Sequence, residues 1–228
     1  MKMQRTVKVL SAALATTILA GTASAADLLD VAVAGSNDHV YYWYSDGQVT
    51  SGTTRNPSRY RTAYSANGLV GMSLMAVGIA GSNDHVYYWW RAPDGSMSVT
   101  SGTTDNPMRY VEEPYDFFGL GGQTLIAAGI AGSNDHVYYW WSDNQTGQIT
   151  VSSGTSAAPQ AYLNRRSFHG APMAQFNELI AAGIAGSNDH VYYWWRNRAT
   201  GEITVTSGTS TNPLAYISEP YDANLALF

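Results

Sequence analysis

The chain has 228 residues, of which 45% are hydrophobic and 13% charged, with a net charge of −5 at pH 7 and no cysteine. The acidic balance argues against nucleic acid or an anionic membrane surface as a partner. The absence of cysteine excludes disulfides, so a packed core must stabilise the fold.

The first segment, residues 1–25, has the features of a secretory signal peptide. It has a basic start, an apolar middle over 9–20 and a small-residue end, Ala-Ser-Ala, at 23–25. A retained membrane anchor is the alternative, but the apolar stretch is shorter than the roughly 20 residues of a span. We therefore expect a mature chain that begins at Ala26, carries nine arginines, 17 acidic residues and no lysine, and is extracellular or periplasmic, with no membrane insertion.

A nine-residue motif is repeated four times along the rest of the chain. Gly-Ser-Asn-Asp-His-Val-Tyr-Tyr-Trp occurs letter for letter at 35–43, 81–89, 132–140 and 186–194. The copies are about 50 residues apart, a period that is typical of repeat architectures. Each repeat is therefore expected to form one structural unit.

Each repeat begins with two elements around the turn of the motif. A run of small apolar residues comes first, at 28–34, 74–80, 125–131 and 179–185. Such a run suits a strand crowded near a central axis. The turn formers Gly-Ser-Asn-Asp then lead into an aromatic strand. In the first copy, alternation divides the strand residues between two faces, with His39, Tyr41 and Trp43 on one and Val40, Tyr42 and Tyr44 on the other.

The second half of each repeat contains a Gly-tipped hairpin, a third strand and a proline-containing loop. Third strands are expected at 149–153 and 203–207, for example. After the proline comes a tyrosine, which we expect to return to the core: Tyr60, Tyr110, Tyr162 or Tyr216. A short, irregular outer strand is expected to complete the unit.

Four antiparallel units with no convincing helix signal predict an all-β fold, a four-bladed β-propeller in a single domain over 26–228. An open array, or half of a larger ring completed by a second chain, is the alternative. A homo-oligomer is compatible with either arrangement.

The blade sequence resembles that of secreted propeller lectins of the tectonin and tachylectin type. The resemblance is carried by Gly-x-x-Asp-x-Val-Tyr-x-Trp after a small-residue strand, followed by a Gly-tipped hairpin. It covers about 25 residues of each repeat, as expected for one part of a propeller blade. This resemblance implies a propeller fold and a sugar-binding role, with glycans or glycoconjugates as partners. The sequence differs from the expected pattern in having four blades and no tryptophan on the third strand.

The motif suggests a repeated ligand site. Turn carboxylates could accept hydrogen bonds from sugar hydroxyls, and turn amides could both accept and donate them. An aromatic ring next to the motif could stack on a pyranose. The candidate ligand-binding residues are Asn37, Asp38, Tyr44, Asn83, Asp84, Trp90, Asn134, Asp135, Trp141, Asn188, Asp189 and Trp195. The structural alternative is that the aspartates form Asx turns and that all the rings belong to the core.

The sequence favours a binding protein over an enzyme. Asp and His recur in every repeat, whereas catalysis normally needs one asymmetric arrangement. The unrepeated candidates, His169, Glu112, Glu113 and Glu178, lie in no recognisable motif. We therefore expect no catalytic residue, cofactor or metal, although Asp-His pairs around a channel could hold a cation. A multivalent lectin is the favoured function, and a structural or adhesion protein or a secreted hydrolase is the alternative.

Overall fold

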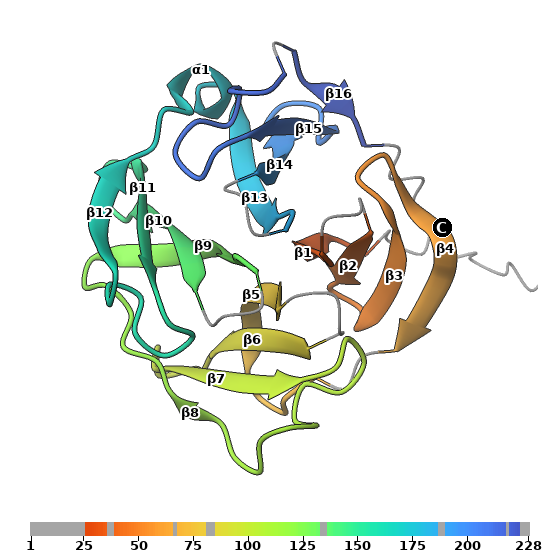
Figure 1. Ribbon diagram of the computed structural model, residues 1–228, viewed down its shortest axis with the longest axis vertical. Coiled ribbons are helices and arrows are strands. Elements are labelled where there is room, and N and C mark those ends of the chain that lie inside the picture. Colours follow the sequence, from red (N-terminus) through yellow and green to blue (C-terminus); the bar gives the residue numbers. More distant parts are fainter. Residues whose placement is uncertain are drawn as a thin grey trace, which may run out of the picture.

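The repeats form four antiparallel sheets arranged around a central axis (Figure 1). The structure is a computed structural model that describes residues 26–35, 39–65, 68–80, 85–132, 136–186, 190–217 and 219–223. Each sheet has four strands, so the predicted all-β, four-bladed propeller is confirmed.

The strands follow the chain in order within each blade, from the axis outwards. The first and second blades contain β1 (Leu28–Val33), β2 (Val40–Tyr44), β3 (Gln48–Thr53), β4 (Asn56–Ser65), β5 (Ser73–Ala80), β6 (His85–Arg91), β7 (Met97–Gly102) and β8 (Tyr115–Asp116). The third and fourth contain β9 (Gln123–Ile130), β10 (Val137–Asp143), β11 (Ile149–Gly154), β12 (Leu163–Ser167), β13 (Asn177–Ile184), β14 (Val191–Asn197), β15 (Ile203–Gly208) and β16 (Tyr221–Asp222).

Helical structure is minimal in the described part of the chain. It contains one helix, α1 (Ala171–Ala174), in the connection between the third and fourth blades. No helix there is long and apolar enough to cross a membrane.

The inner strands β1, β5, β9 and β13 pack side by side around the axis because their residues are small (Figure 1). An added Cβ on Gly78 would lie 2.9 Å from Cγ1 of Ile130 in the next blade. The same relation joins Gly129 to Ile184, and Gly183 to Val33 in the first blade. The small-residue runs are thus an adaptation to close packing at the axis, as their composition predicts.

The tryptophan that ends each motif packs against the next blade. Its indole packs edge-to-face on a buried tyrosine of the following blade, with ring centroids 5.6 to 6.2 Å apart and interplanar angles of 86 to 90°. The four pairs are Trp43 with Tyr88, Trp89 with Tyr139, Trp140 with Tyr193 and Trp194 with Tyr42. Perpendicular rings of this kind are favourable beyond the apolar area that they bury.

The ring closes within one chain. At the seam between the last and first blades, the Tyr221 hydroxyl donates to Thr54 Oγ1 at 3.3 Å. The guanidinium of Arg55 lies 4.1 Å from the centroid of the Tyr221 ring, and Arg196 donates to the Leu28 carbonyl. The alternative of a half ring that needs a second chain therefore does not apply to this fold.

Candidate functional site

A cluster of one histidine and two tyrosines recurs in all four blades. The histidine of the motif stacks on the tyrosine two residues later, with centroids 4.8 to 5.0 Å apart and interplanar angles of 15 to 28°. The tyrosine after the loop proline packs edge-to-face on the same histidine at 4.8 to 5.0 Å. The clusters are His39–Tyr41–Tyr60, His85–Tyr87–Tyr110, His136–Tyr138–Tyr162 and His190–Tyr192–Tyr216.

The loop that carries the third ring is held against the strand before it. In the second blade, a Cβ on Gly102 would lie 1.9 Å from the Asn106 carbonyl oxygen, so only glycine allows the loop to approach so closely. The buried Tyr88 donates its hydroxyl hydrogen to the Thr103 carbonyl, and the Tyr110 N–H donates to the Ser101 carbonyl at 2.9 Å. The same close approach of glycine occurs in the other three blades, so the fold presents this tyrosine four times.

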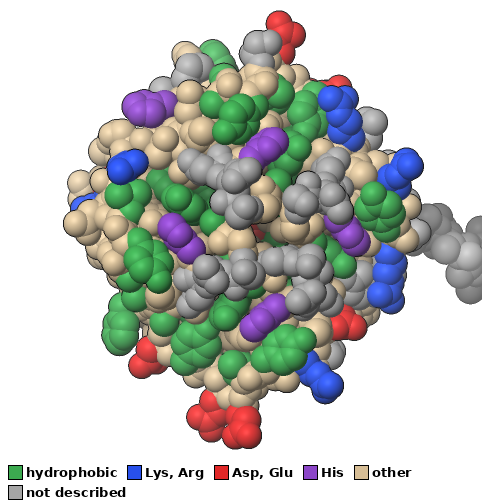
Figure 2. Space-filling model, viewed as in Figure 1, with side chains coloured by type: hydrophobic (Ala, Val, Ile, Leu, Met, Phe, Trp, Pro, Cys, Tyr) green, Lys and Arg blue, Asp and Glu red, His purple; other side chains and the backbone are tan. Residues whose placement is uncertain are grey.

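These loop tyrosines are exposed, which corrects the expectation that they return to the core. The exposed fractions of their side chains are 57%, 54%, 60% and 56% for Tyr60, Tyr110, Tyr162 and Tyr216. The chain after the proline does turn back, but the ring lies over the half-buried histidine and not beneath it. Figure 2 views this end of the propeller and shows histidine side chains spaced around the centre of the face. We call the four exposed tyrosines with their histidines the His-Tyr face.

Two of the four histidines are hydrogen-bonded to serines of the third strand. His85 Nε2 lies 2.7 Å from Ser101 Oγ, and His190 Nε2 lies 2.7 Å from Ser207 Oγ. The buried Nε2 atoms of His39 and His136 have no hydrogen-bond partner. Among the described residues, no group of three or more His, Cys, Asp or Glu side chains could hold a metal ion. The face presents exposed tyrosine rings beside half-buried histidines.

The candidate residues chosen from the sequence fall into three groups. The motif amides and carboxylates lie outside the described residues: Asn37, Asp38, Asn83, Asp84, Asn134, Asp135, Asn188 and Asp189. Trp90, Trp141 and Trp195 have exposed fractions of 4%, 0% and 0%, so the structure places them in the core, the alternative interpretation given above. Tyr44 is half-buried, and burial raises the pKa of its phenol.

Aspartates at two hairpin tips illustrate the structural use of this residue type. The Ser96 hydroxyl donates to Asp94 Oδ1 at 2.6 Å, and this hydrogen bond lowers the pKa of the Asp94 carboxyl. The backbone N–H of Thr146 donates to Asp143 Oδ1 at 2.9 Å and lowers the pKa of Asp143 in the same way. Both carboxylates stabilise turns, and Asp94 is exposed whereas Asp143 is half-buried.

A second concave region lies on the axis at the opposite end of the propeller. It is a cavity of about 690 Å³ lined by the first residues of all four inner strands. Its apolar part includes Leu29, Met75, Ile126 and Ile180, and its charged part includes Asp27, Asp143, Glu178, Arg196 and Arg198. The charges come from single copies, so this cavity does not share the fourfold repetition of the His-Tyr face.

One buried carboxylate breaks the symmetry of the inner ring. Asp30 lies on β1 and is 1% exposed, whereas the other inner strands have Ala76, Ala127 and Ala181 at the same register. Its carboxylate accepts hydrogen bonds from the N–H groups of Val31 at 2.7 Å and Val77 at 2.6 Å. Burial raises the pKa of Asp30 well above its ordinary value, and these two hydrogen bonds only partly oppose the rise.

The fold and its repeated face define a four-bladed propeller with a recurring aromatic surface. No family model matches the chain, and no curated protein matches it either. Solved structures with partial similarity include hydrazine synthase from Kuenenia stuttgartiensis, at 12% identity and a TM-score of 0.38, and U3-55K, at 9% and 0.39. The similarity covers 90% and 79% of this chain, and the chain spans about half of each of those structures, 52% and 48%.

Proposed function

We propose that the protein is a secreted, multivalent carbohydrate-binding protein with one weak site in each blade of the His-Tyr face. The observation that carries this proposal is the presence of an exposed tyrosine ring beside a histidine in all four blades. The proposed function is non-catalytic, because the residues that form the face are repeated and catalysis normally needs a single asymmetric arrangement.

The chemistry of the face suits a sugar. The flat, apolar side of a pyranose can stack on a tyrosine ring, and the phenol hydroxyl gives the ring a polar edge for hydrogen bonding. The Asn and Asp that precede each histidine in the sequence are the chemical types that would donate hydrogen bonds to sugar hydroxyls and accept them.

Each site is expected to bind weakly and the four together strongly. A shallow site with one stacking ring and a few hydrogen bonds should have a Kd near 1 mM, equal to about −4 kcal/mol. Sites on one face can engage the same glycan-bearing surface, and linked binding of this kind can raise avidity by roughly 10² to 10⁴. Cell or particle agglutination should therefore be far more sensitive than monovalent binding.

The tyrosines provide the direct test. We expect the combined variant with Tyr60, Tyr110, Tyr162 and Tyr216 changed to Ala to lower the agglutination titre by roughly 100-fold or more, because avidity is lost with the sites. Tyr110→Ala alone should lower it less. Glycan-array binding with competition by free sugar would identify the ligand for the parent protein.

Exposed phenylalanines outside the clusters provide the control. Phe118 and Phe176 are 77% and 63% exposed, so their change to Ala also removes surface aromatic rings but should leave agglutination unchanged. If the folded tyrosine variant agglutinates as well as the parent, the His-Tyr face is not the binding surface. If no glycan binds the parent on an array, the structural or adhesion alternative is favoured.

The motif aspartates separate ligand binding from turn formation. Asp→Asn at 38, 84, 135 and 189 keeps the side-chain size and much of the turn bonding but removes the charge. We expect reduced agglutination with little change in stability if these carboxylates accept sugar hydroxyls. Unchanged agglutination by the folded variant would assign the aspartates to the turn alone.

Secretion is a part of this proposal that is tested separately. We expect N-terminal sequencing of the protein from its own cells to find Ala26 or a neighbouring residue at the mature end, because signal peptidase cleaves after small residues. A retained Met1 would contradict both cleavage and an extracellular ligand.

A further inference from the structure

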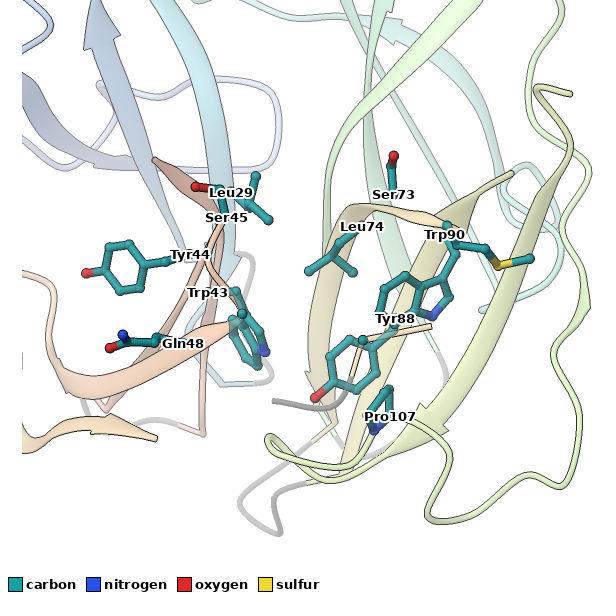
Figure 3. Close-up of a pocket in the computed structure, with 13 residues that line it drawn as sticks. Leu29, Trp43, Tyr44, Ser45, Gln48, Ser73, Leu74, Tyr88, Trp90 and Pro107 are labelled. Carbon is teal, nitrogen blue, oxygen red and sulfur yellow. The ribbon is translucent and has the colours of Figure 1, made fainter. Parts of the chain in front are cut away.

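A second kind of site lies between the first and second blades. It is a pocket of about 340 Å³ with a base of buried aromatic side chains, Trp43, Tyr88 and Trp90 (Figure 3). Leu74 borders it above Tyr88 (Figure 3), and the exposed hairpin residues Ser45 and Gln48 lie at its rim. No charged side chain is among the described residues that line it.

The equivalent position is filled at two other blade interfaces. Phe117, the residue after β8, stacks on Trp141 with an interplanar angle of 4° and centroids 6.2 Å apart. Phe168, after β12, stacks on Trp195 at 6.2 Å and 27°. In both cases a phenyl ring stacks on the indole, whereas among the described residues Trp90 has only Tyr88 stacked on it and borders the pocket. These two interfaces show which chemical group fits against this tryptophan.

The difference between the interfaces can be read in the sequence. The strands pair in the same register, Val49 with Tyr64 in the first blade and Val99 with Tyr115 in the second. Two residues further on, the second and third repeats have Phe117 and Phe168, the fourth has Ala223, and the first has Ala66, which lies outside the described residues.

The residues around the pocket are less well packed than their equivalents at the filled interface. Leu74 is only half-buried, whereas Leu125 at the same place in the third blade is 1% exposed and packs in one cluster with Phe117 and Trp141. Among the described residues, the indole N–H groups of Trp43 and Trp194 have no hydrogen-bond partner, whereas those of Trp89 and Trp140, at the two interfaces filled by a phenyl ring, donate to backbone carbonyls at 3.0 Å. The first interface is therefore less completely packed than the second.

We propose that this pocket binds a small, uncharged aromatic molecule whose ring takes the place of the missing phenyl group against Trp90. The volume is sufficient, since ligand pockets begin at about 300 Å³ and an apolar cavity of about 150 Å³ already holds benzene. The uncharged lining disfavours an ionic ligand, whose desolvation would not be compensated. This site is single and is formed by other residues than the His-Tyr face, so it does not depend on the proposed sugar binding.

The test uses p-cresol as the probe and the indole N–H signals of the ¹⁵N-labelled protein as the readout. We expect p-cresol to shift the signals of Trp43 and Trp90, to saturate at one molecule per chain, and to leave Trp140 and Trp141 unmoved. The matched saturated molecule, 4-methylcyclohexanol, should bind several-fold more weakly because it lacks a flat ring. The charged 4-methylbenzoate should also bind more weakly.

Two variants should change p-cresol binding in opposite directions. Leu74 is the cross-strand partner of Trp90, so Leu74→Phe places a ring in the pocket and should weaken p-cresol binding roughly tenfold, equal to about 1.4 kcal/mol. Phe117→Ala should open an equivalent pocket at the next interface, so that Trp141 also responds and two molecules bind. Phe118→Ala, a change at the adjacent exposed residue, is the matched control and should add no site.

Three experimental results would contradict the proposed aromatic site. The proposal is overturned if p-cresol shifts neither Trp43 nor Trp90, if it shifts all the indoles alike, or if folded Leu74→Phe binds p-cresol as well as the parent does. Should Phe117→Ala fail to fold, Phe168→Ala at the other filled interface replaces it as the test variant. The Leu74→Phe result does not depend on either of these variants. None of these changes should affect agglutination, so failure here leaves the proposed sugar binding untouched.

Discussion

Trp141→Ala is expected to destabilise the protein by about 3 to 5 kcal/mol. Trp141 is fully buried in a cluster with Tyr139 and Phe117, whose ring centroids lie 5.9 and 6.2 Å from its own. Its indole N–H also donates to Ser152 Oγ at 2.9 Å, so the change leaves both a cavity and an unpaired hydroxyl. Because natural domains are stable by only about 5 to 15 kcal/mol, urea unfolding should show a large loss.

The same change at Trp90 is the matched control. Trp90 stacks on Tyr88 at 5.8 Å and donates to Thr100 Oγ1 at 2.9 Å, as Trp141 does with its own neighbours, but no phenylalanine ring of the described residues is stacked on it. Trp90→Ala should therefore cost less than Trp141→Ala, by the 0.5 to 1.5 kcal/mol or so that an aromatic pair contributes. A Trp141→Ala variant that stays fully stable yet no longer agglutinates would contradict the core assignment and restore the exposed-ring interpretation.

The repeat made the architecture predictable. Four copies of a turn and an aromatic strand, each preceded by small apolar residues, indicated four blades with crowded inner strands, and Gly78 against Ile130 shows the physical reason. Within one strand, alternation also predicted the shared face of His39, Tyr41 and Trp43, whose rings are in contact. These features depend on local periodicity, which a sequence displays directly.

Features that depend on the neighbouring blade could not be predicted in the same way. Whether Trp90 or Trp141 is exposed depends on a residue of another repeat, and both faces of these sheets are apolar. Tyr110 follows a proline in an irregular loop, where no period indicates the direction of its side chain. Aligning the repeats could have revealed Asp30, which stands where the other three repeats have Ala76, Ala127 and Ala181, and the alternation of Ala66 and Ala223 with Phe117 and Phe168.

Asp30 makes stability depend on pH in a direction that follows from its burial. Its carboxyl has a raised pKa in the folded protein because burial disfavours the charged form. In the unfolded chain its pKa should be near the ordinary value of about 3.9. Between these two pKa values the folded state binds more protons than the unfolded state, so stability falls as pH rises through this range and levels off above it.

The Asp30→Asn variant should lack this dependence. The amide oxygen can still accept one of the hydrogen bonds from Val31 and Val77, but the side chain no longer titrates. From about pH 4 upwards the parent should lose up to about 1.4 kcal/mol of stability per pH unit relative to the variant, and the variant should be the more stable protein at pH 7. Urea unfolding of both proteins from pH 3.5 to 8 measures the difference and cancels the contributions of all other groups. Parallel stability curves would show that Asp30 has the same pKa in the folded and unfolded states, in contradiction to its burial between β1 and β5.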